Sequence, residues 1–323
     1  MLLSVVVPAY NEEAVLTQFH ERLKAVLAQL PLDHEVIYVN DGSRDRTLTI
    51  LEELHAKDAS VGVINLSRNF GKEAAMTAGL DLAHGDAAVV IDADLQDPPE
   101  LIAEFVRVWR EEGYDVVYAT RESRAGESWV KRSTASAFYW VMSKVSDVAI
   151  PRDTGDFRLM SRRALDALKG LREHHRFMKG LFAWVGFPSK AVLYERDPRF
   201  AGESKWNYLK LWNFSLEGIT GFSIAPLKIA TYLGLLISIF AAILGTQIIL
   251  ETLLYGADVP GYPSLFSAVL FFGGVQLFFL GIIGEYLGRV FNESKRRPLY
   301  LIQDQLEAKP AKGAKSDKAG KKE

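Results

Sequence analysis

The sequence predicts an α/β protein in which a mostly parallel, Rossmann-like sheet is followed by two membrane-spanning helices. In the first part of the chain, short apolar runs rich in valine and isoleucine alternate with stretches of helical length, as is typical of a doubly wound sheet. Two later apolar runs each exceed the roughly 20 residues that a helix needs to cross a bilayer. The hydrophobic fraction of 49% is correspondingly high for a chain of 323 residues.

The soluble part is expected to contain strands at residues 4–8, 35–40, 61–66, 87–91 and 116–119, with helices at about 12–22, 44–57, 72–84 and 99–112. Ligands of such a sheet bind beyond the carboxyl ends of its strands. Polar loops stand at those ends, in residues 8–12, 40–43, 68–72 and 92–97. No Gly-x-Gly-x-x-Gly and no Gly-Lys-Ser/Thr loop occurs, which argues against dinucleotide and P-loop sites.

The loop Asp92-Ala-Asp94-Leu-Gln96-Asp97 gathers carboxylate and amide oxygens at the end of the fourth expected strand. Such oxygens suit Mg²⁺ or Mn²⁺, and Mg²⁺ takes only one or two carboxylates, with phosphate oxygens and water as its other ligands. The leading interpretation is a metal ion that bridges a diphosphate. The alternative is a capped turn, because Asp97 followed by two prolines also reads as a helix start.

The other loops add groups suited to a nucleotide. A buried Asp41 carboxylate can accept hydrogen bonds from a base or ribose, Tyr10 can present a ring face, and Lys72 at a helix start can add positive charge near phosphate. A purely structural turn at residues 40–43 that caps the next helix is the alternative.

The membrane hairpin is predicted at about residues 226–254 and 263–287. From Ile229 to Leu254 only Glu251 is charged, and from Pro263 to Ile283 no residue is charged. Lysines and arginines flank the two runs, whereas the loop at residues 255–262 contains neither. This asymmetry predicts that both termini and the site lie on the cytoplasmic side of an inner membrane. A buried hairpin of core helices is the alternative.

Residues 204–223 predict an amphipathic helix at the membrane interface, because Trp206, Leu209, Trp212 and Leu216 recur at helical spacing. A core helix under the sheet is the alternative. Residues 291–323 predict a basic cytoplasmic tail that is disordered at its end, since residues 309–323 contain six lysines and no aromatic residue. Attraction of those lysines to an anionic leaflet is the less favoured interpretation of this tail.

Composition excludes several classes of protein. The chain has no cysteine, so disulfides and thiolate metal sites are excluded. The net charge of -2 does not bear on nucleic acid binding, and no basic-aromatic patch occurs, so no nucleic acid partner is predicted.

Four motifs together resemble the family 2 glycosyltransferases of GT-A fold. They are Pro8-x-Tyr10-Asn-Glu12, Asp41-Gly-Ser, Asp92-x-Asp94 and Gly155-Asp156-Phe-Arg-Leu-Met. Within that family, residues 3–303 are most similar to the polyprenyl-phosphate glycosyltransferases, in particular those that glucosylate bactoprenol (undecaprenyl phosphate), and more distantly to dolichol-phosphate mannose synthases. The resemblance implies a catalytic domain at residues 1–203, ahead of the interfacial segment, the hairpin at 224–290 and the tail.

The resemblance also implies roles for individual positions. Uridine-binding positions of the family correspond to Pro8, Tyr10, Glu12 and Asp41, and Asp92 lies near the ribose and diphosphate. The metal pair corresponds to Asp94 and Gln96, and Asp156 to the acidic residue assigned to catalysis. Positions that hold the lipid phosphate or the donor diphosphate correspond to Arg121, Arg132, Arg199, Ser204 and Lys205. A loop at residues 121–130 would close over the donor.

The implied activity is nonprocessive, inverting transfer of one hexose from a UDP-sugar to polyprenyl phosphate, with Mg²⁺ or Mn²⁺ as cofactor. Glucose is the first choice, and N-acetylglucosamine, galactose, mannose and a modified arabinose stay open. The family also implies a homo-oligomer, as a tetramer, and a downstream flippase and membrane glycosyltransferase as partners. A processive synthase is disfavoured because no Gln-x-x-Arg-Trp motif occurs. A catalytically dead scaffold that binds nucleotide sugar is the third interpretation.

The sequence allows three roles for Asp156. A phosphate monoester with a second pKa near 6 is mostly a dianion at neutral pH and needs no base, which favours Asp156 as a residue that positions the sugar or an arginine. A base role is the alternative. A structural carboxylate that pairs with Arg158 or caps a helix at Ser161 is a further one.

Overall fold

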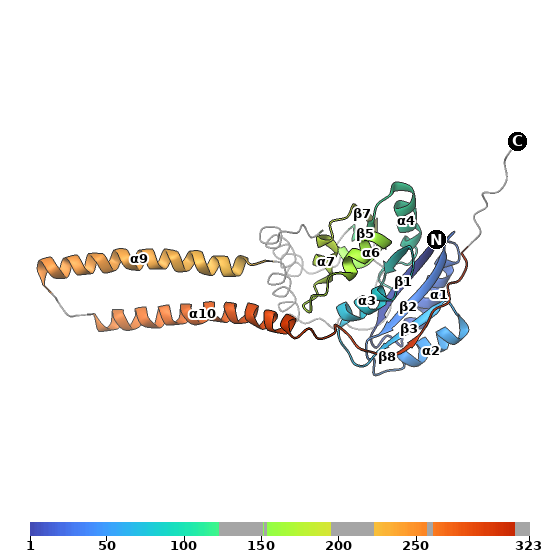
Figure 1. The fold of residues 1–323 in the computed structure, drawn as a ribbon, viewed down its shortest axis with the longest axis horizontal. Helices are drawn as coiled ribbons and strands as arrows, with labels where there is room; N and C mark the ends of the chain where they lie inside the picture. The colour runs from blue at the N-terminus through green and yellow to red at the C-terminus, as the bar shows by residue number, and fades with distance from the viewer. Residues whose placement is uncertain (123–150, 152–153, 195–222, 257–260, 314–323) are drawn as a thin grey trace.

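The computed structural model describes residues 1–122, 151, 154–194, 223–256 and 261–313. Within these residues one sheet has the strand order β7-β5-β6-β4-β1-β2-β3-β8. Two long helices project away from the sheet and the helices packed on it (Figure 1). The strands are β1 (Leu2–Ala9), β2 (Asp33–Asn40), β3 (Val61–Leu66), β4 (Ala87–Val90), β5 (Val116–Arg121), β6 (Thr154–Ser161), β7 (Ser189–Tyr194) and β8 (Ile302–Leu306).

The central strands β4-β1-β2-β3 are parallel, as the alternating pattern predicts. Nearly all of their residues are buried, because helices cover both faces, and this explains why each strand is a continuous apolar run. One face packs against α1 (Leu16–Leu27), α2 (Thr47–Lys57) and α4 (Leu101–Arg107), which a π-helical turn η1 (Val108–Glu112) continues. The other face packs against α3 (Lys72–Asp81), α6 (Arg162–Lys169) and α7 (Met178–Trp184).

Strand β6 enters the sheet antiparallel, between β4 and β5. Its pairing sets Arg158 opposite Val90, close to the carboxyl end of β4. The first residues of β6, which include Asp156, therefore lie beside the loop that follows β4. This placement joins two motifs that are far apart in the sequence.

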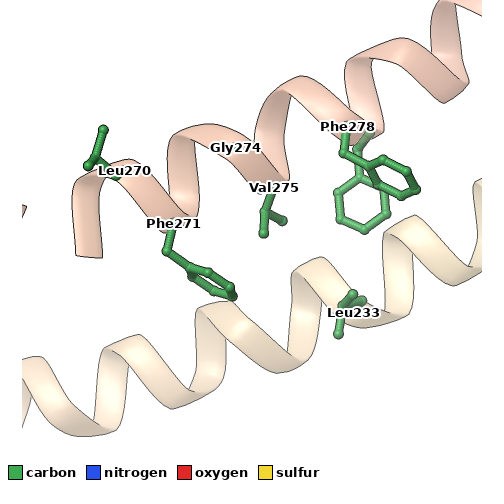
Figure 2. Close-up of a pocket in the computed structure, with 7 residues that line it drawn as sticks. Leu233, Leu270, Phe271, Gly274, Val275 and Phe278 are labelled. Carbon is green, nitrogen blue, oxygen red and sulfur yellow. The ribbon is translucent and has the colours of Figure 1, made fainter. Parts of the chain in front are cut away.

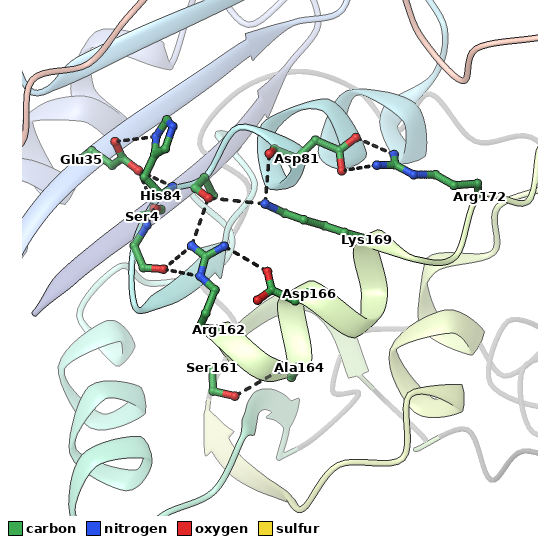
Figure 3. A network of polar contacts seen from close by, with 12 residues as sticks. Ser4, Glu35, Asp81, His84, Ser161, Arg162, Ala164, Asp166, Lys169 and Arg172 are labelled. Carbon is green, nitrogen blue, oxygen red and sulfur yellow. Dashed lines mark hydrogen bonds and ion pairs between the residues drawn. The ribbon is translucent and has the colours of Figure 1, made fainter.

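A polar network lies at the amino ends of the central strands, opposite the loop that follows β4 (Figure 3). Arg162, at the start of α6, donates to the backbone oxygen of Gly85 at 2.9 Å. The Asp81 carboxylate at the end of α3 accepts from Arg172 at 2.6 and 3.1 Å and from the Tyr300 hydroxyl at 2.8 Å. The end of α3 is therefore bonded both to the segment after α6 and to the chain that returns from the long helices.

The long helices are α9 (Ala225–Tyr255) and α10 (Tyr262–Ser294), and each is long and apolar enough to cross a membrane. In the described part of the chain their apolar stretches are not buried, which argues against the alternative of a core hairpin. A groove between them is lined by apolar side chains, among them Leu233 of α9 and Phe271, Val275 and Phe278 of α10 (Figure 2). Helix α10 continues beyond the expected residue 287 to Ser294.

The chain after α10 differs from the expected separate tail, because it returns to the sheet as β8. This strand pairs antiparallel with β3, and the backbone N–H of Ser67 donates to the Leu301 carbonyl at 2.9 Å. Further along, Lys309 and Ala311 bond to the backbone of Ala59 and His34. Without β8 the backbone groups of β3 would form an open edge, which explains why the segment binds there. Residues 314–323 lie outside the described residues.

Candidate active site

The loops after β1 and β2 bond to each other at the carboxyl edge of the sheet. The backbone N–H of Asn11 donates to Ser43 Oγ at 3.0 Å, and that of Glu12 to Thr47 Oγ1 at 2.9 Å. The helices α1 and α2 begin at Leu16 and Thr47, later than the expected residues 12 and 44.

The uridine-binding candidates lie on these two loops. Pro8 is buried at the end of β1, and Tyr10 and Glu12 are half-buried beyond it. The structure therefore brings these three residues to the same edge as the loop that contains Asp41. Their contact with a nucleotide stays a prediction.

The Asp41 carboxylate is only 2% exposed and accepts from the backbone N–H groups of Phe70 and Gly71, at 2.7 and 3.0 Å. Burial raises the pKa of Asp41, and the two hydrogen bonds from backbone N–H groups partly offset that rise. Gly42, with φ of 63°, lies so close to Arg68 that a Cβ would come within 2.5 Å of the Arg68 backbone. In this structure Asp41 ties the loop after β2 to the loop after β3, which is a structural role.

Lys72 lies between the two acidic motifs. Its Nζ donates to Asp92 Oδ2 at 2.7 Å and to Asp156 Oδ2 at 2.6 Å. Helix α3, the loop after β4 and strand β6 thus each supply one member of a cluster. The Arg158 guanidinium donates to the backbone carbonyls of Gly155, at 2.8 Å, and of Asp156, at 3.3 Å, and not to the Asp156 carboxylate.

The proposed helix cap at Ser161 does not involve Asp156 either. Ser161 caps α6 with its own hydroxyl, which accepts from the Ala164 N–H. Both structural alternatives for Asp156 are therefore replaced by its ion pair with Lys72.

The electrostatics of the cluster favour a charged Asp156. Burial opposes its charge, but Lys72 and Lys179 outweigh burial and lower the pKa of Asp156 to about 2. Burial raises the pKa of Asp92, and Lys72 offsets only part of that effect. Burial also disfavours the ammonium of Lys72, yet Asp156 and Asp92 together raise the pKa of Lys72 well above its usual value. Asp156 is accordingly an anion throughout the neutral range.

Successive side chains of the loop after β4 point in alternate directions. Ala93 and Leu95 are 3% and 4% exposed and point into the core, whereas Asp92, Asp94 and Gln96 are half-buried on the other side. One carboxylate oxygen of Asp94 accepts the backbone N–H of Gln96 at 3.1 Å. The loop therefore presents the predicted metal pair on the same side as Asp92.

The donor set of the loop fits a divalent ion that takes its other ligands elsewhere. Among the residues that the structure describes, no group of three or more His, Cys, Asp or Glu side chains forms a complete metal site. Asp94 and Gln96 supply two oxygens, and Mg²⁺ or Mn²⁺ would complete its shell with diphosphate oxygens and water. Asp97 is buried and accepts from the Tyr194 hydroxyl, so it fixes the loop to β7.

Three further charged residues surround Asp156: Glu73 and Lys179, for which the sequence predicts no role, and Arg158, which it predicts only as a structural partner of Asp156. Burial, followed by the repulsion of Asp156, raises the pKa of Glu73 to about 8. The Arg158 guanidinium lies over the Phe182 ring, 3.7 Å from its centroid. Glu73 and Lys179 stand in motifs that resemble the family, residues 68–73 and 177–180, but neither follows directly on a strand, so strand ends alone assign them no role.

The candidates for lipid or donor phosphate are only partly described. Arg121 ends β5, and its Nε is buried without a hydrogen-bond partner in the described part of the chain. Arg132, Arg199, Ser204 and Lys205 lie outside the described residues, as do nearly all of the expected closing loop and the interfacial segment up to residue 222.

Comparisons with known proteins identify the family of this chain. The model of glycosyl transferase family 2 matches residues 4–169, and that of the GtrB C-terminal hairpin matches residues 225–290. An uncharacterized glycosyltransferase of Synechocystis sp. is 56% identical over 94% of this chain and 95% of its own. The bactoprenol glucosyl transferase of Shigella phage SfV is 45% identical over 94% of this chain and 99% of its own. The chain therefore belongs to glycosyl transferase family 2, and it is a glycosyltransferase of GT-A fold with a C-terminal helical hairpin.

Proposed function

We propose that the protein transfers one hexose, glucose in the first instance, from a UDP-sugar to undecaprenyl or another polyprenyl phosphate at the cytoplasmic face of the membrane. The observation that carries the proposal is the cluster of Lys72, Asp92 and Asp156 beside the Asp94 loop, in a chain whose apolar hairpin is exposed. The name of the phage relative, bactoprenol glucosyl transferase, supports the same acceptor and sugar.

The chemistry follows from the charges of the site. A divalent ion held by Asp94 and Gln96 would neutralise charge on the departing diphosphate. The acceptor phosphate, with a second pKa near 6, attacks as a dianion without losing a proton. A phosphate oxygen forms the new bond to the anomeric carbon while the bond to UDP breaks, and this single in-line displacement inverts the configuration. Asp156, ionised and fixed by Lys72, orients the reactants rather than removing a proton.

The hairpin explains how the acceptor reaches the site. A polyprenyl tail stays in the bilayer, and helices α9 and α10 would hold the catalytic domain at the surface where the headgroup lies. The expected homo-oligomer, and the flippase and second glycosyltransferase that would act on the product, are part of this proposal.

The decisive experiment incubates purified protein with radiolabelled UDP-sugars and undecaprenyl phosphate in vesicles, followed by analysis of the organic phase. We expect one hexose per lipid, glucose in preference to other sugars, with an anomeric configuration opposite to that of the donor. Polymeric product would indicate a processive synthase instead. Nucleotide binding without any turnover would indicate a scaffold.

A further inference from the structure

Lys179 stands in the first turn of α7, and two contacts fix this helix beside the catalytic cluster. The backbone N–H of Met178 faces the Glu73 carboxylate, and the Phe182 ring packs under the Arg158 guanidinium. Lys179 and Phe182 are three positions apart and therefore share one face of the helix. That face is turned toward β6, two residues of which are Asp156 and Arg158.

Lys179 differs from the neighbouring cations in its partners. Lys72 is paired with two carboxylates, and Arg158 is engaged by backbone oxygens and the Phe182 ring. In the described part of the chain, Lys179 forms neither an ion pair within 4.0 Å nor a hydrogen bond, although Asp156 attracts it from further away. Burial lowers the pKa of Lys179, and the cations Lys72, Arg158 and Arg121 add to that effect. Among Lys72, Arg158 and Lys179, the Lys179 ammonium thus has the fewest partners in the described part of the chain.

The segment that leads into α7 contacts the end of the membrane hairpin. The backbone N–H of His174 donates to Glu293 Oε1 at 2.6 Å, and Asn292 Nδ2 lies 3.3 Å from His175 Nε2. Glu293 and Asn292 belong to the last turns of α10, which precede the return of the chain to the sheet. Lys179 therefore comes from the helix that follows this contact with α10, whereas Lys72 begins α3 and is held by Asp92 and Asp156.

We propose that Lys179 binds the phosphate of the membrane-bound acceptor, while Lys72 remains with Asp92 and Asp156 at the donor side. The inference rests on the proposed function. An incoming phosphate dianion would supply the counter-charge that Lys179 lacks among the described residues, and a charge-assisted hydrogen bond would hold the attacking oxygen near Asp156. The ligand class is a phosphate monoester, whether on a long lipid or on a short soluble chain.

The test compares Lys179→Met and Lys179→Arg with Lys190→Met. Lys190 is a matched control because it is a lysine of β7 paired with Glu112, remote from the cluster. We expect Lys179→Met to raise the KM for undecaprenyl phosphate by roughly 10-fold to 100-fold, as loss of a hydrogen bond to a charged group implies. UDP affinity should change less than twofold. Lys179→Arg should recover most of the loss, and Lys190→Met should match the parent.

A short, water-soluble prenyl phosphate separates phosphate binding from contact with the bilayer. The same rise in KM for the short acceptor and for the lipid in vesicles would support a phosphate site, and a rise confined to vesicles would overturn it. An unchanged acceptor KM, or a higher KM for UDP-sugar instead, would overturn it too. If the Tm of Lys179→Met is lower than that of the parent, Lys179→Gln provides the same comparison. A parent protein that glycosylates no prenyl phosphate would overturn the proposed function itself.

Discussion

At the scale of single residues, the position of Lys72 decides how Asp156 can act. Its ammonium lies 2.6 Å from the Asp156 carboxylate and lowers the pKa of Asp156, and Lys179 lowers that pKa further. A general base works best when its pKa lies near the working pH, and a pKa of about 2 is far below that range. The ion pair therefore favours Asp156 as an orienting anion.

Replacing Asp156 with Asn tests this role. The amide keeps the shape but loses the charge that Lys72 holds, so we expect kcat to fall by roughly 100-fold or more while activity stays measurable. The pH dependence should be the same in both proteins, with a rise near pH 6 that belongs to the acceptor phosphate. Rates measured from pH 5 to 9 check this. A rising limb that is present in the parent and absent from Asp156→Asn would establish a base instead.

Removal of the metal tests the Asp94 loop. Asp94→Ala, or excess EDTA with the parent protein, should raise the activation free energy of transfer by several kcal/mol, because the leaving diphosphate loses its charge stabiliser. The rate should therefore fall by a few decades. Titration calorimetry with Mn²⁺ present should show that Asp94→Ala binds UDP more weakly than the parent does. Circular dichroism should show that the fold of the variant is unchanged. Glu100→Ala is the control, since Glu100 is an exposed partner of Arg22 beside the same loop. Full activity in EDTA would rule out the metal.

At the scale of elements, β8 links the end of the chain to the loops of the site. Asn65 of β3 donates to Asp304 of β8 at 3.3 Å and accepts from Asn40 at 2.8 Å. Asn40 in turn accepts the backbone N–H of Ser43 at 3.3 Å. A strand that follows the membrane hairpin thus supports the loop that contains Asp41.

A chain that ends at Leu301 lacks β8 and should be less stable. Loss of several ladder hydrogen bonds at about 1 kcal/mol each predicts a fall of a few kcal/mol in the free energy of unfolding, with a decrease in Tm on the order of 10 °C. UDP affinity should fall as well, because the support of Asn40 is lost. A chain that ends at Gly313 keeps β8 and serves as the control in thermal melts. Equal melting of both chains would show that β8 does not stabilise the domain.

At the scale of the whole molecule, the catalytic domain is discontinuous in sequence. The hairpin is inserted between β7 and β8, and both of these strands belong to one sheet (Figure 1). The hairpin is therefore joined in sequence to strands of the same sheet at both of its ends. A deletion of everything after residue 205 would remove β8 together with the hairpin.

A sharper variant replaces residues 206–297 with a flexible Gly/Ser linker and keeps β8. We expect this protein to be soluble and to bind UDP with metal, because the donor-side residues are intact. Transfer to full-length lipid in vesicles should nearly vanish, since the effective concentration of headgroup at the site is lost. A short prenyl phosphate should restore part of the activity. Equal rates of the variant and the parent on vesicles would show that the hairpin does not deliver the acceptor.

The sequence by itself determined the parallel half of the sheet, the two long apolar helices and the polar loops at the strand ends. These features follow from local patterns: continuous apolar runs, their length and the residues next to them. The Asp92 loop, Asp156 and Lys72 could be selected in this way because each stands in a motif of adjacent residues.

Only the tertiary structure decided which charges meet. The pairing of Lys72 with both Asp92 and Asp156 depends on the antiparallel entry of β6, and the location of Lys179 depends on the packing of α7 against Arg158. Strand β8 gave no signal because its side chains are all exposed and it joins the sheet through backbone hydrogen bonds, which any sequence can form. Contacts between distant segments are set by the packing of the whole chain, and no local pattern records them.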